Sequence, residues 1–269
     1  MTLTERSGSA FGERVGNAGE RLSRPAFFVP AFFVFTMTGL WVDSYTDLTA
    51  QILLSAVPWV VLVVVCVPLS LEDRTRVAVV VVAATMGEVV GSIIWGLYVY
   101  RLDNLPLFVP AGHGLVYLAG WRISQLGIAA RRRGRFVTVV IALIAAWGVI
   151  GLSGVLGRYD VAGAFGCLVV IAFLLISRDA PVIAGVFLVV AVLEIYGVWI
   201  GTWSWVPIVP GLGVPMGNPP SGAVSGYVGF DLTGVLLGPL VAGLLARWGA
   251  RRTGAGAGHH ENPEIPGIR

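Results

Sequence analysis

The sequence contains no lysine, and all eighteen of its basic residues are arginines. Without a lysine amine, no side chain can form the Schiff base that holds retinal or a carbonyl substrate, so a retinal-binding pump is excluded. Charge of either sign is scarce, because charged residues make up 12% of the 269 residues and hydrophobic residues make up 56%. With a mean hydropathy of +0.83, this composition lies outside that of soluble domains. The scarcity of charge therefore indicates a polytopic membrane protein.

The sequence also lacks the motifs of common metal, nucleotide and hydrolase sites. It has no His-Glu-x-x-His, no Cys-x-x-Cys, no phosphate-binding glycine loop and no Gly-x-Ser-x-Gly elbow. Its two cysteines, Cys66 and Cys167, lie in apolar segments and are expected to be small buried hydrophobes. Asp43 and Asp47 have the spacing with which intramembrane prenyltransferases hold magnesium and diphosphate, but no second aspartate-rich cluster accompanies them. We therefore predict neither a metal nor a cofactor.

Long apolar runs dominate the chain. They predict an all-α fold with eight transmembrane helices, at about 25–42, 50–70, 76–100, 107–130, 136–156, 161–177, 180–204 and 222–247. Together these helices form a predicted transmembrane domain over 25–247. The preceding segment 1–24 is polar and lacks the pattern of a cleaved signal peptide. The Gly/Pro-rich tail 248–269 is expected to be disordered.

The positions of the arginines predict the orientation of these helices. Only Arg101 and Arg158 fall on one side of the membrane, and the other loop and terminal arginines fall on the opposite side. By the positive-inside rule, the arginine-rich side is cytoplasmic, so both termini are cytoplasmic in a bacterial-type inner membrane. An even number of spans agrees with this. The basic run 131–135 is then a topology signal, and no nucleic-acid site is expected.

Similar motifs occur in both halves of the chain. Glu88–Gly91 is followed by Val109–Pro110, and Glu194–Gly197 is followed by Val214–Pro215. Because four spans per half is an even number, the two halves have the same orientation. We predict two parallel four-helix repeats related by an axis along the membrane normal, with any central site between them. The predicted halves are about 25–130 and 136–247.

Three acidic residues, Glu88, Glu194 and Asp231, lie inside the predicted helices. Ionisable groups inside a membrane are costly unless paired or hydrated, so they are functional candidates. At about 1.5 Å per residue, Glu88 is expected roughly 18 Å and Arg122 roughly 22 Å below the outer ends of their helices. Glu194 and Asp231 are both expected at roughly 13–15 Å. These depths predict two pairs, Glu88 with Arg122 and Glu194 with Asp231.

The predicted chemistry is acid–base catalysis by buried carboxyls. Glu88, Glu194 and Asp231 are the candidate catalytic residues, because a carboxylic acid in a dry pocket can protonate a carbon–carbon double bond. Aromatic rings can stabilise the cation that forms. The candidate substrate-binding residues are His113 and Asn218 at the expected mouth, together with Arg122, Trp95, Tyr98, Trp199 and Trp203. The alternative interpretation is structural, with helix-locking pairs and an interfacial aromatic belt.

The stretch that begins at Glu88 resembles a known family. The quoted residues are Glu88-x-x-Gly91, Trp95-Gly96-x-Tyr98-x-Tyr100 and Val109-Pro110, with a weaker echo at Glu194, Gly197, Gly201 and Val214-Pro215. Their order looks like a motif of the bacterial carotenoid-biosynthesis membrane proteins that include the bacterioruberin-type hydratases. The resemblance implies a polytopic enzyme that adds water to the end of a polyene. It also implies that Glu88 and Glu194 occupy the positions of the family's motif glutamates. The chain departs from the family pattern after each Val-Pro, where His113 and Asn218 replace a more apolar run.

Three functions are compatible with these residues. One is an integral membrane enzyme of lyase or isomerase type that hydrates, cyclises or isomerises a carotenoid, another isoprenoid or a lipid. Another is a proton-coupled transporter, whose acids would line a path between the halves. The third is a non-catalytic membrane scaffold. All three predict the bilayer and membrane lipids or a hydrophobic small molecule as partners. A cavity that opens sideways to lipid favours the enzyme, and a polar cavity open to one aqueous face favours transport.

Overall fold

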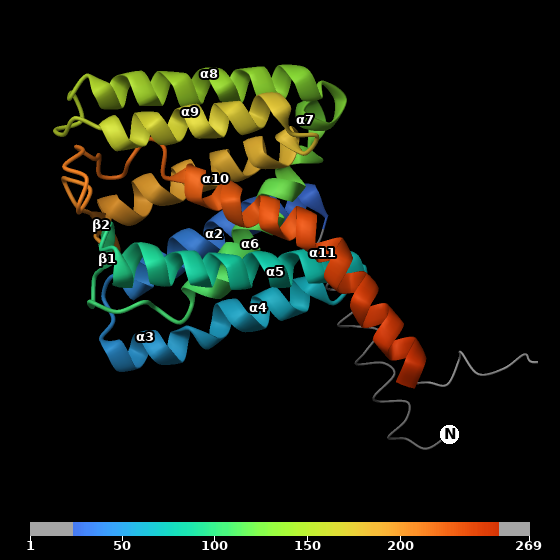
Figure 1. Cartoon of the computed structure of the whole chain (residues 1–269). Coiled ribbons are helices and arrows are strands. Elements are labelled where there is room, and N and C mark those ends of the chain that lie inside the picture. The colour runs from blue at the N-terminus through green and yellow to red at the C-terminus, as the bar shows by residue number, and fades with distance from the viewer. Residues whose placement is uncertain (1–23, 253–269) are drawn as a thin grey trace, which may run out of the picture.

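The computed structural model describes residues 24–252, with side chains described up to Trp248. The predictions for the segments 1–24 and 248–269 fall almost entirely outside these residues. The regular secondary structure of the described chain is helical except for one short pair of strands and an isolated bridge between Ile208 and Pro215 (Figure 1). The elements are α2 (Pro25–Asp43), α3 (Leu48–Leu54), α4 (Ala56–Cys66), α5 (Leu71–Glu88), the π-helical turn η1 (Val89–Ile94), β1 (Tyr98–Tyr100), α6 (Val109–Ser124), α7 (Gly127–Arg131), α8 (Arg133–Leu152), α9 (Val161–Ile176), α10 (Ala180–Trp199), β2 (Trp203–Trp205) and α11 (Val224–Arg252).

Polar residues of the loops begin several of these helices. Asp47, Ser70 and Asp160 lie at the N-caps of α3, α5 and α9, and each side chain accepts a backbone N–H from the first turn. Between the caps the helices are built largely from Val, Leu, Ile, Ala and Phe. A helix satisfies its backbone polar groups internally, which is what the interior of a bilayer requires.

Within residues 24–252, six helices are long and apolar enough to cross a membrane, whereas the sequence predicted eight. They are Pro25–Asp43, Leu48–Cys66, Leu71–Ile94, Arg133–Leu152, Ala180–Trp199 and Val224–Trp248. The two remaining predicted segments became α6 and α9, which have 16 residues each. At about 1.5 Å per residue such a helix is roughly 24 Å long, which is shorter than a typical hydrocarbon core. The six apolar helices agree with a polytopic membrane protein, but eight complete spans are not shown.

The centre of the bundle is formed by α6 and α10, which pack closely together. A Cβ atom added to Gly120 would overlap the backbone of Val186, and one added to Gly185 would overlap the carbonyl of Gly120. The absence of side chains at these two glycines lets the helices approach within backbone contact, as is common in membrane proteins. Around this centre, α5 packs against α11, and α8 packs against α9.

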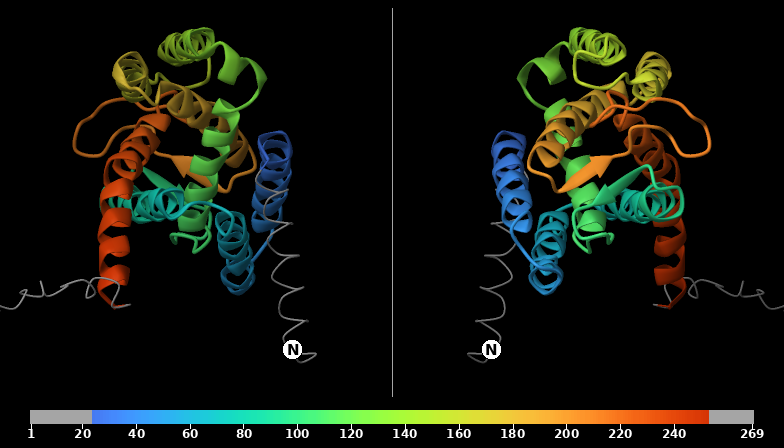
Figure 2. Two further views of the ribbon diagram at one scale, coloured as in Figure 1. Left: turned by 90° about the vertical axis from the view of Figure 1, so that its right-hand side faces the viewer. Right: turned by 90° about the vertical axis from the view of Figure 1, so that its left-hand side faces the viewer.

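The two strands pair antiparallel at one end of the bundle. Tyr98 lies opposite Trp205, Val99 opposite Ser204, and Tyr100 opposite Trp203. Viewed from that end, the strands cross the middle of the molecule, with α2 and α11 at opposite edges (Figure 2, right). The turns that lead into the strands use glycine where φ is positive, +70° at Gly96 and +77° at Gly201. The strand pair thus joins the chain after η1 to the chain after α10.

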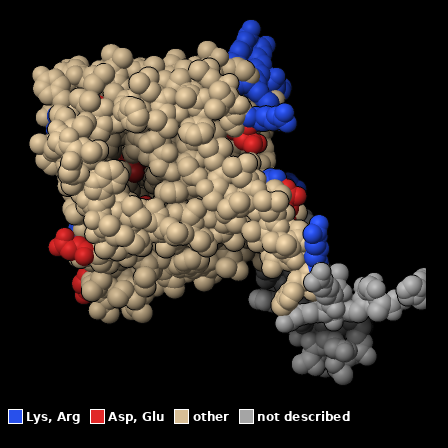
Figure 3. All heavy atoms as spheres, viewed as in Figure 1, with Lys and Arg blue, Asp and Glu red and all other residues tan. Residues whose placement is uncertain are grey.

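Charged side chains are concentrated at the ends of the helices. In Figure 3, arginines gather at the end of the bundle opposite the strands, near α7, and the broad face between the two ends is almost uncharged. The helices carry many exposed apolar side chains, such as Val82, Phe165 and Leu237. Such a surface fits contact with lipid chains.

Candidate functional site

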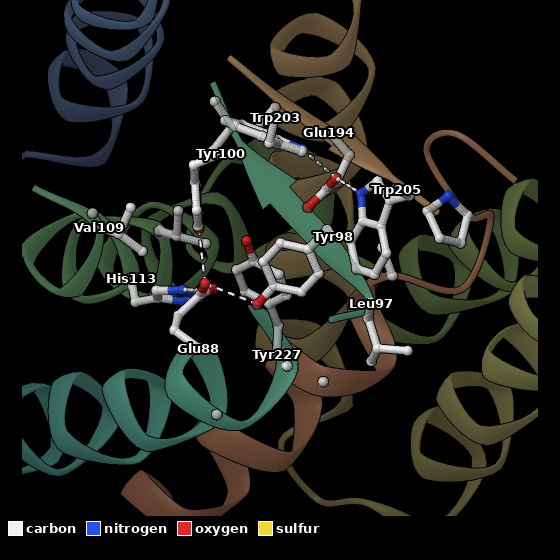
Figure 4. Close-up of a pocket in the computed structure, with 18 of the residues that line it drawn as sticks. Glu88, Leu97, Tyr98, Tyr100, Val109, His113, Glu194, Trp203, Trp205 and Tyr227 are labelled. Atoms are coloured by element: carbon white, nitrogen blue, oxygen red, sulfur yellow. Dashed lines mark hydrogen bonds and ion pairs between the residues drawn. The ribbon is translucent and has the colours of Figure 1, made fainter. Parts of the chain in front are cut away.

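A cavity of about 890 Å³ lies between the strand pair and the helices. Residues of α2, α5, α6, α9, α10 and α11 line it, and most of them are apolar or aromatic. Glu88 of α5 and Glu194 of α10 are among the few carboxyls in its wall. Both are buried, with exposed fractions of 6% and 4%. In Figure 4 the two carboxyls flank Tyr98 from opposite sides.

Hydrogen-bond donors surround the Glu88 carboxyl on both oxygens. Oε2 accepts from the hydroxyls of Tyr98 and Tyr100, both at 2.8 Å. Oε1 lies 2.8 Å from Nε2 of His113, which is itself only 5% exposed. His113 comes from α6, where Pro110 sits in the first turn and fixes the start of the helix. Glu88 is therefore held in one orientation by three side chains from two other elements.

The Glu194 carboxyl is held differently. Its Oε2 accepts hydrogen bonds from the indole N–H groups of Trp203 at 2.9 Å and Trp205 at 3.0 Å. Its Oε1 accepts no hydrogen bond from the described part of the chain. One oxygen of Glu194 is thus fixed by the strand, and the other is available to a molecule in the cavity.

The tyrosines at the site remain hydrogen-bond donors. Burial, followed by the neighbouring Glu88 carboxyl, raises the pKa of Tyr100 well above its ordinary value. The same two causes raise the pKa of Tyr98. Because both phenols keep their protons over the physiological range, they donate to Glu88 rather than compete with it for charge.

Small residues make room for the strand residues beside each glutamate. A Cβ atom on Gly91 would press against the ring of Tyr98, and one on Gly197 would overlap the ring of Trp203. Each of these glycines lies one helical turn after a glutamate, on the same face. Both glycines therefore leave room for the aromatic rings of the strand residues.

Further aromatic rings complete the wall. The Tyr227 ring of α11 lies 4.8 Å from the His113 ring, between centroids, and the Tyr98 ring lies 4.5 Å from that of Trp205. Phe230 also packs against His113, at 5.7 Å. The carboxyls of Glu88 and Glu194 are consequently surrounded by the faces and edges of aromatic rings rather than by other charged groups.

The cavity reaches the lipid-facing sides of the bundle. Its lining includes Leu54 and Val57, which are 41% and 47% exposed, and Phe165 and Leu212, which are 69% and 65% exposed. Figure 3 shows a hollow in the broad uncharged face, near α10 and the start of α11, with acidic atoms at its floor. The opening is therefore on the side of the helices.

The two residue pairs predicted from helical depth do not form. Arg122 donates to Gln125 at 3.1 Å, and its guanidinium lies over the ring of Trp121, so it does not pair with Glu88. Asp231 is buried on α11 but does not line the cavity, and it makes no hydrogen bond with Glu194. The depth argument counted residues 95–100 and 200–204 as helix, which placed Glu88 and Glu194 too far from the ends of their helices.

Other predicted residues divide between the cavity and its surroundings. Tyr98, His113 and Trp203 contact the glutamates directly. Trp95 lines the edge of the cavity and donates to the Pro210 carbonyl at 3.0 Å. Asn218 accepts from the Trp205 backbone N–H at 2.9 Å, so it positions the strand. Trp199 is 79% exposed and lies outside the cavity.

Three residues of the site were not among the predicted ones: Tyr100, Trp205 and Tyr227. The sequence did carry a signal for two of them. Tyr98 and Tyr100, like Trp203 and Trp205, are two residues apart, and residues at that spacing share one face of a strand. This two-residue spacing did not identify Tyr100 and Trp205 because both segments were interpreted as the ends of helices. Tyr227 had no local signal, because only the packing of α11 brings it to His113.

No family model matches the chain, and no curated protein or solved structure matches it either. Within residues 24–252, no group of three or more His, Cys, Asp or Glu side chains is placed to hold a metal ion. The chemistry of the site is therefore argued from its own residues. These are two buried glutamates of unlike hydrogen bonding, in an apolar cavity that opens on the side of a helical membrane protein.

Proposed function

We propose that the chain is an integral membrane enzyme that performs acid–base chemistry on a hydrophobic isoprenoid or lipid substrate. The observation that carries the proposal is the sideways-opening apolar cavity with Glu88 and Glu194 in its wall. A substrate without charged groups can reach such a cavity from the bilayer without crossing water. A polyene or isoprenoid chain fits this description, and the motif resemblance to carotenoid-biosynthesis proteins points to the same class.

Glu194 is the proposed proton donor. Two indole N–H groups fix its Oε2, so a proton on Oε1 can point to a carbon–carbon double bond in the cavity. Protonation breaks the π bond, forms a C–H bond and leaves a carbocation and the Glu194 carboxylate. The rings of Tyr98, Trp203 and Trp205 can stabilise this cation through their faces.

Glu88 and His113 form the proposed proton acceptor. In a hydration, water adds to the cation and its extra proton passes to this pair. In an isomerisation or cyclisation, a C–H next to the cation loses its proton to the pair instead. Transfer of that proton back to Glu194 resets the site. The tyrosine and histidine contacts hold Glu88 in place for this role.

The site also supports the proposal of two parallel repeats. Each glutamate takes hydrogen bonds from the aromatic pair of the strand that follows its own helix. In the proposed repeat, Tyr98 corresponds to Trp203 and Tyr100 to Trp205. A twofold rotation that exchanges the two halves then converts the observed pair Tyr98–Trp205 into the other observed pair, Tyr100–Trp203. This is the register that an axis along the membrane normal would produce. With the arginines at the other end, the proposed topology has both termini in the cytoplasm of a bacterial-type inner membrane.

Conservative variants of the two glutamates test the proposed catalysis. Glu194→Gln and Glu88→Gln keep the size and the hydrogen-bond acceptor of each side chain but remove the acid. We expect each to lower product formation by a factor of roughly 100 or more, as loss of a general acid or base does. Membranes from a carotenoid-producing bacterial host that carries each variant would be extracted, and the polyene and lipid products separated by chromatography.

Glu72→Gln is the matched control, because Glu72 is an exposed glutamate on the same helix as Glu88. Its products should equal those of the wild type. If both Glu88→Gln and Glu194→Gln retain wild-type products, the catalytic assignment is wrong.

A proton-coupled transporter is the second candidate, because two carboxyls in one cavity could load and release protons. It predicts uptake of protons together with a solute into vesicles that contain the purified protein and a pH-sensitive dye. The apolar lining and the sideways opening favour the enzyme. A solute-dependent pH change that Glu194→Gln abolishes would favour the transporter over the enzyme.

A further inference from the structure

The cavity reaches the surface beside α2 and α4, at one edge of the bundle. Gly39 of α2, Leu54 at the end of α3 and Val57 of α4 line the cavity, and all three are exposed. Helices α2 and α4 each pack against α6 but make few contacts with one another. The cavity therefore opens sideways between these two helices, and we call this opening the α2–α4 mouth.

A second group of exposed residues lines the cavity at the opposite edge. It consists of Phe165 of α9, Leu212 of the loop between β2 and α11, and Gly226 of α11. In both views of Figure 2, α2 and α4 lie toward one edge of the molecule, and α9 and α11 lie toward the other. The hollow in Figure 3 is on this second side, near the start of α11. We call this opening the α9–α11 mouth.

The two carboxyls lie between the mouths. Glu88 accepts a hydrogen bond from Tyr98 of β1, and Glu194 accepts from Trp203 and Trp205 of β2. The strand pair crosses the middle of the molecule, between the edges formed by α2 and α11 (Figure 2, right). A cavity that ended at the carboxyls would admit only the end of a chain. Because this cavity continues to an opening on each side, a chain can extend from the carboxyls toward both mouths.

We infer that the cavity is a passage open to lipid at both edges, and that it takes a linear hydrocarbon chain whose reacting bond lies away from both chain ends. Each arm of the chain leaves through one mouth, so both ends stay in the bilayer and the chain can be longer than the cavity. The mainly apolar and aromatic lining selects for the shape of such a chain rather than for a polar group. The position of the reacting bond rests on the proposed function, whereas the passage can be tested without turnover.

A cross-linker with two reactive ends tests the passage. Gly39→Cys and Gly226→Cys place one thiol at each mouth, where an added Cβ meets nothing within 4 Å, and Cys66 and Cys167 are replaced by alanine. Linear alkanes of increasing length with a maleimide at each end are added to the full chain in lipid nanodiscs. Above a minimum length, one alkane should join the two thiols. Limited proteolysis at the exposed Arg131–Arg135 run separates the two positions, so only linked protein keeps its two parts together on a denaturing gel.

Gly112→Phe distinguishes a route through the passage from a route around the protein. Gly112 lines the cavity on α6, and an added Cβ there meets nothing within 4 Å, so a bulky side chain enters the cavity. Linking should then fall to the level of either single-cysteine variant. Gly134→Phe is the control, because Gly134 lies on α8 outside the cavity in equally open surroundings. Failure to link at any length, or linking that Gly112→Phe leaves unchanged, would overturn the inference.

Variants of the mouths test where the reacting bond lies. Gly39→Phe narrows one mouth and Gly226→Phe narrows the other. A chain that occupies both arms is obstructed in both variants, so each should lower product formation about tenfold or more, as overpacking of a filled site does. Gly243→Phe is the control, since it is exposed on α11 outside the cavity.

Wild-type product formation in either mouth variant would show that the chain reacts at its end and would contradict the inference. A wild-type protein that forms no product would contradict the proposed function alone, and the linking result would still decide whether the passage exists.

Discussion

Hydrogen bonding, more than burial alone, distinguishes the acidic residues inside this protein. Asp160 accepts four hydrogen bonds, from the backbone N–H groups of Gly163, Gly217 and Ser221 and from the Ser221 hydroxyl, at 2.6–3.0 Å. Asp231 is equally buried, but its Oδ2 has no partner among the described residues. Asp160 therefore stabilises the loop before α11, whereas Asp231 imposes a desolvation cost.

This contrast predicts stability changes of opposite sign. Asp160→Ala leaves four donors unsatisfied and should lower the free energy of unfolding by about 3 kcal/mol. Asp231→Leu replaces an unpaired buried carboxyl with an apolar group of similar size and should raise it by roughly 1 kcal/mol. Thermal unfolding in detergent would measure both, with Glu72→Ala as a surface control that changes little. A lower unfolding temperature for Asp231→Leu would show that Asp231 has a partner or a required charge.

Single residues also show where prediction from sequence works. Glu88 and Glu194 could be identified because a carboxyl in an apolar run is costly and therefore conspicuous. Their partners could not be identified in the same way. His113 was placed near the outer mouth, whereas it bonds Glu88 directly, because only the packing of α6 against α5 sets that contact.

At the level of elements, the apolar runs located the long helices, but the aromatic segments misled the interpretation of their ends. Tyr98–Tyr100 and Trp203–Trp205 were counted as the outer turns of helices, and they form strands instead. The α5–η1 helix ends at Ile94, only six residues after Glu88. Alternating aromatic residues near a membrane surface are compatible with both an interfacial aromatic belt and a β-strand. Only the pairing of two segments that are distant in the sequence distinguishes these two structures.

The contact between α6 and α10 predicts a strong effect of one methyl group. Gly185→Ala places a Cβ against the Gly120 carbonyl and should destabilise the protein by about 2 kcal/mol, because neither backbone can move aside without separating the central helices. Gly243→Ala in α11 meets nothing within 4 Å and should be neutral or slightly stabilising. Unfolding temperatures in one detergent would compare the two variants. Equal effects would mean that the central helices are more loosely packed than described.

For the whole molecule, the strand pair sets how far the two halves can move apart. Val99 and Ser204 lie directly opposite each other and both are exposed. Opposite residues of antiparallel strands have Cα atoms about 4.5–5.5 Å apart, which a disulfide can bridge. An enzyme that takes its substrate from the side needs no separation here, but a transporter that alternates access does.

The double variant Val99→Cys/Ser204→Cys should therefore cross-link under oxidation and keep its product formation within about twofold of the reduced form. Gel mobility after proteolysis between the strands would report the cross-link, and each single variant is its control. Loss of function on oxidation that a reductant restores would instead indicate that the outer end opens during the cycle, and would favour transport.

The strand pair also bears on whether either half could exist alone. A chain ending near residue 130 would present β1 with an unpaired edge and Glu88 beside an incomplete cavity, since Trp205 and Tyr227 come from the other half. The register of the pair allows such a strand to align with a second copy of itself, Tyr98 beside Tyr100. A half of this chain would therefore lack both the strand partner and the part of the cavity wall that the other half supplies.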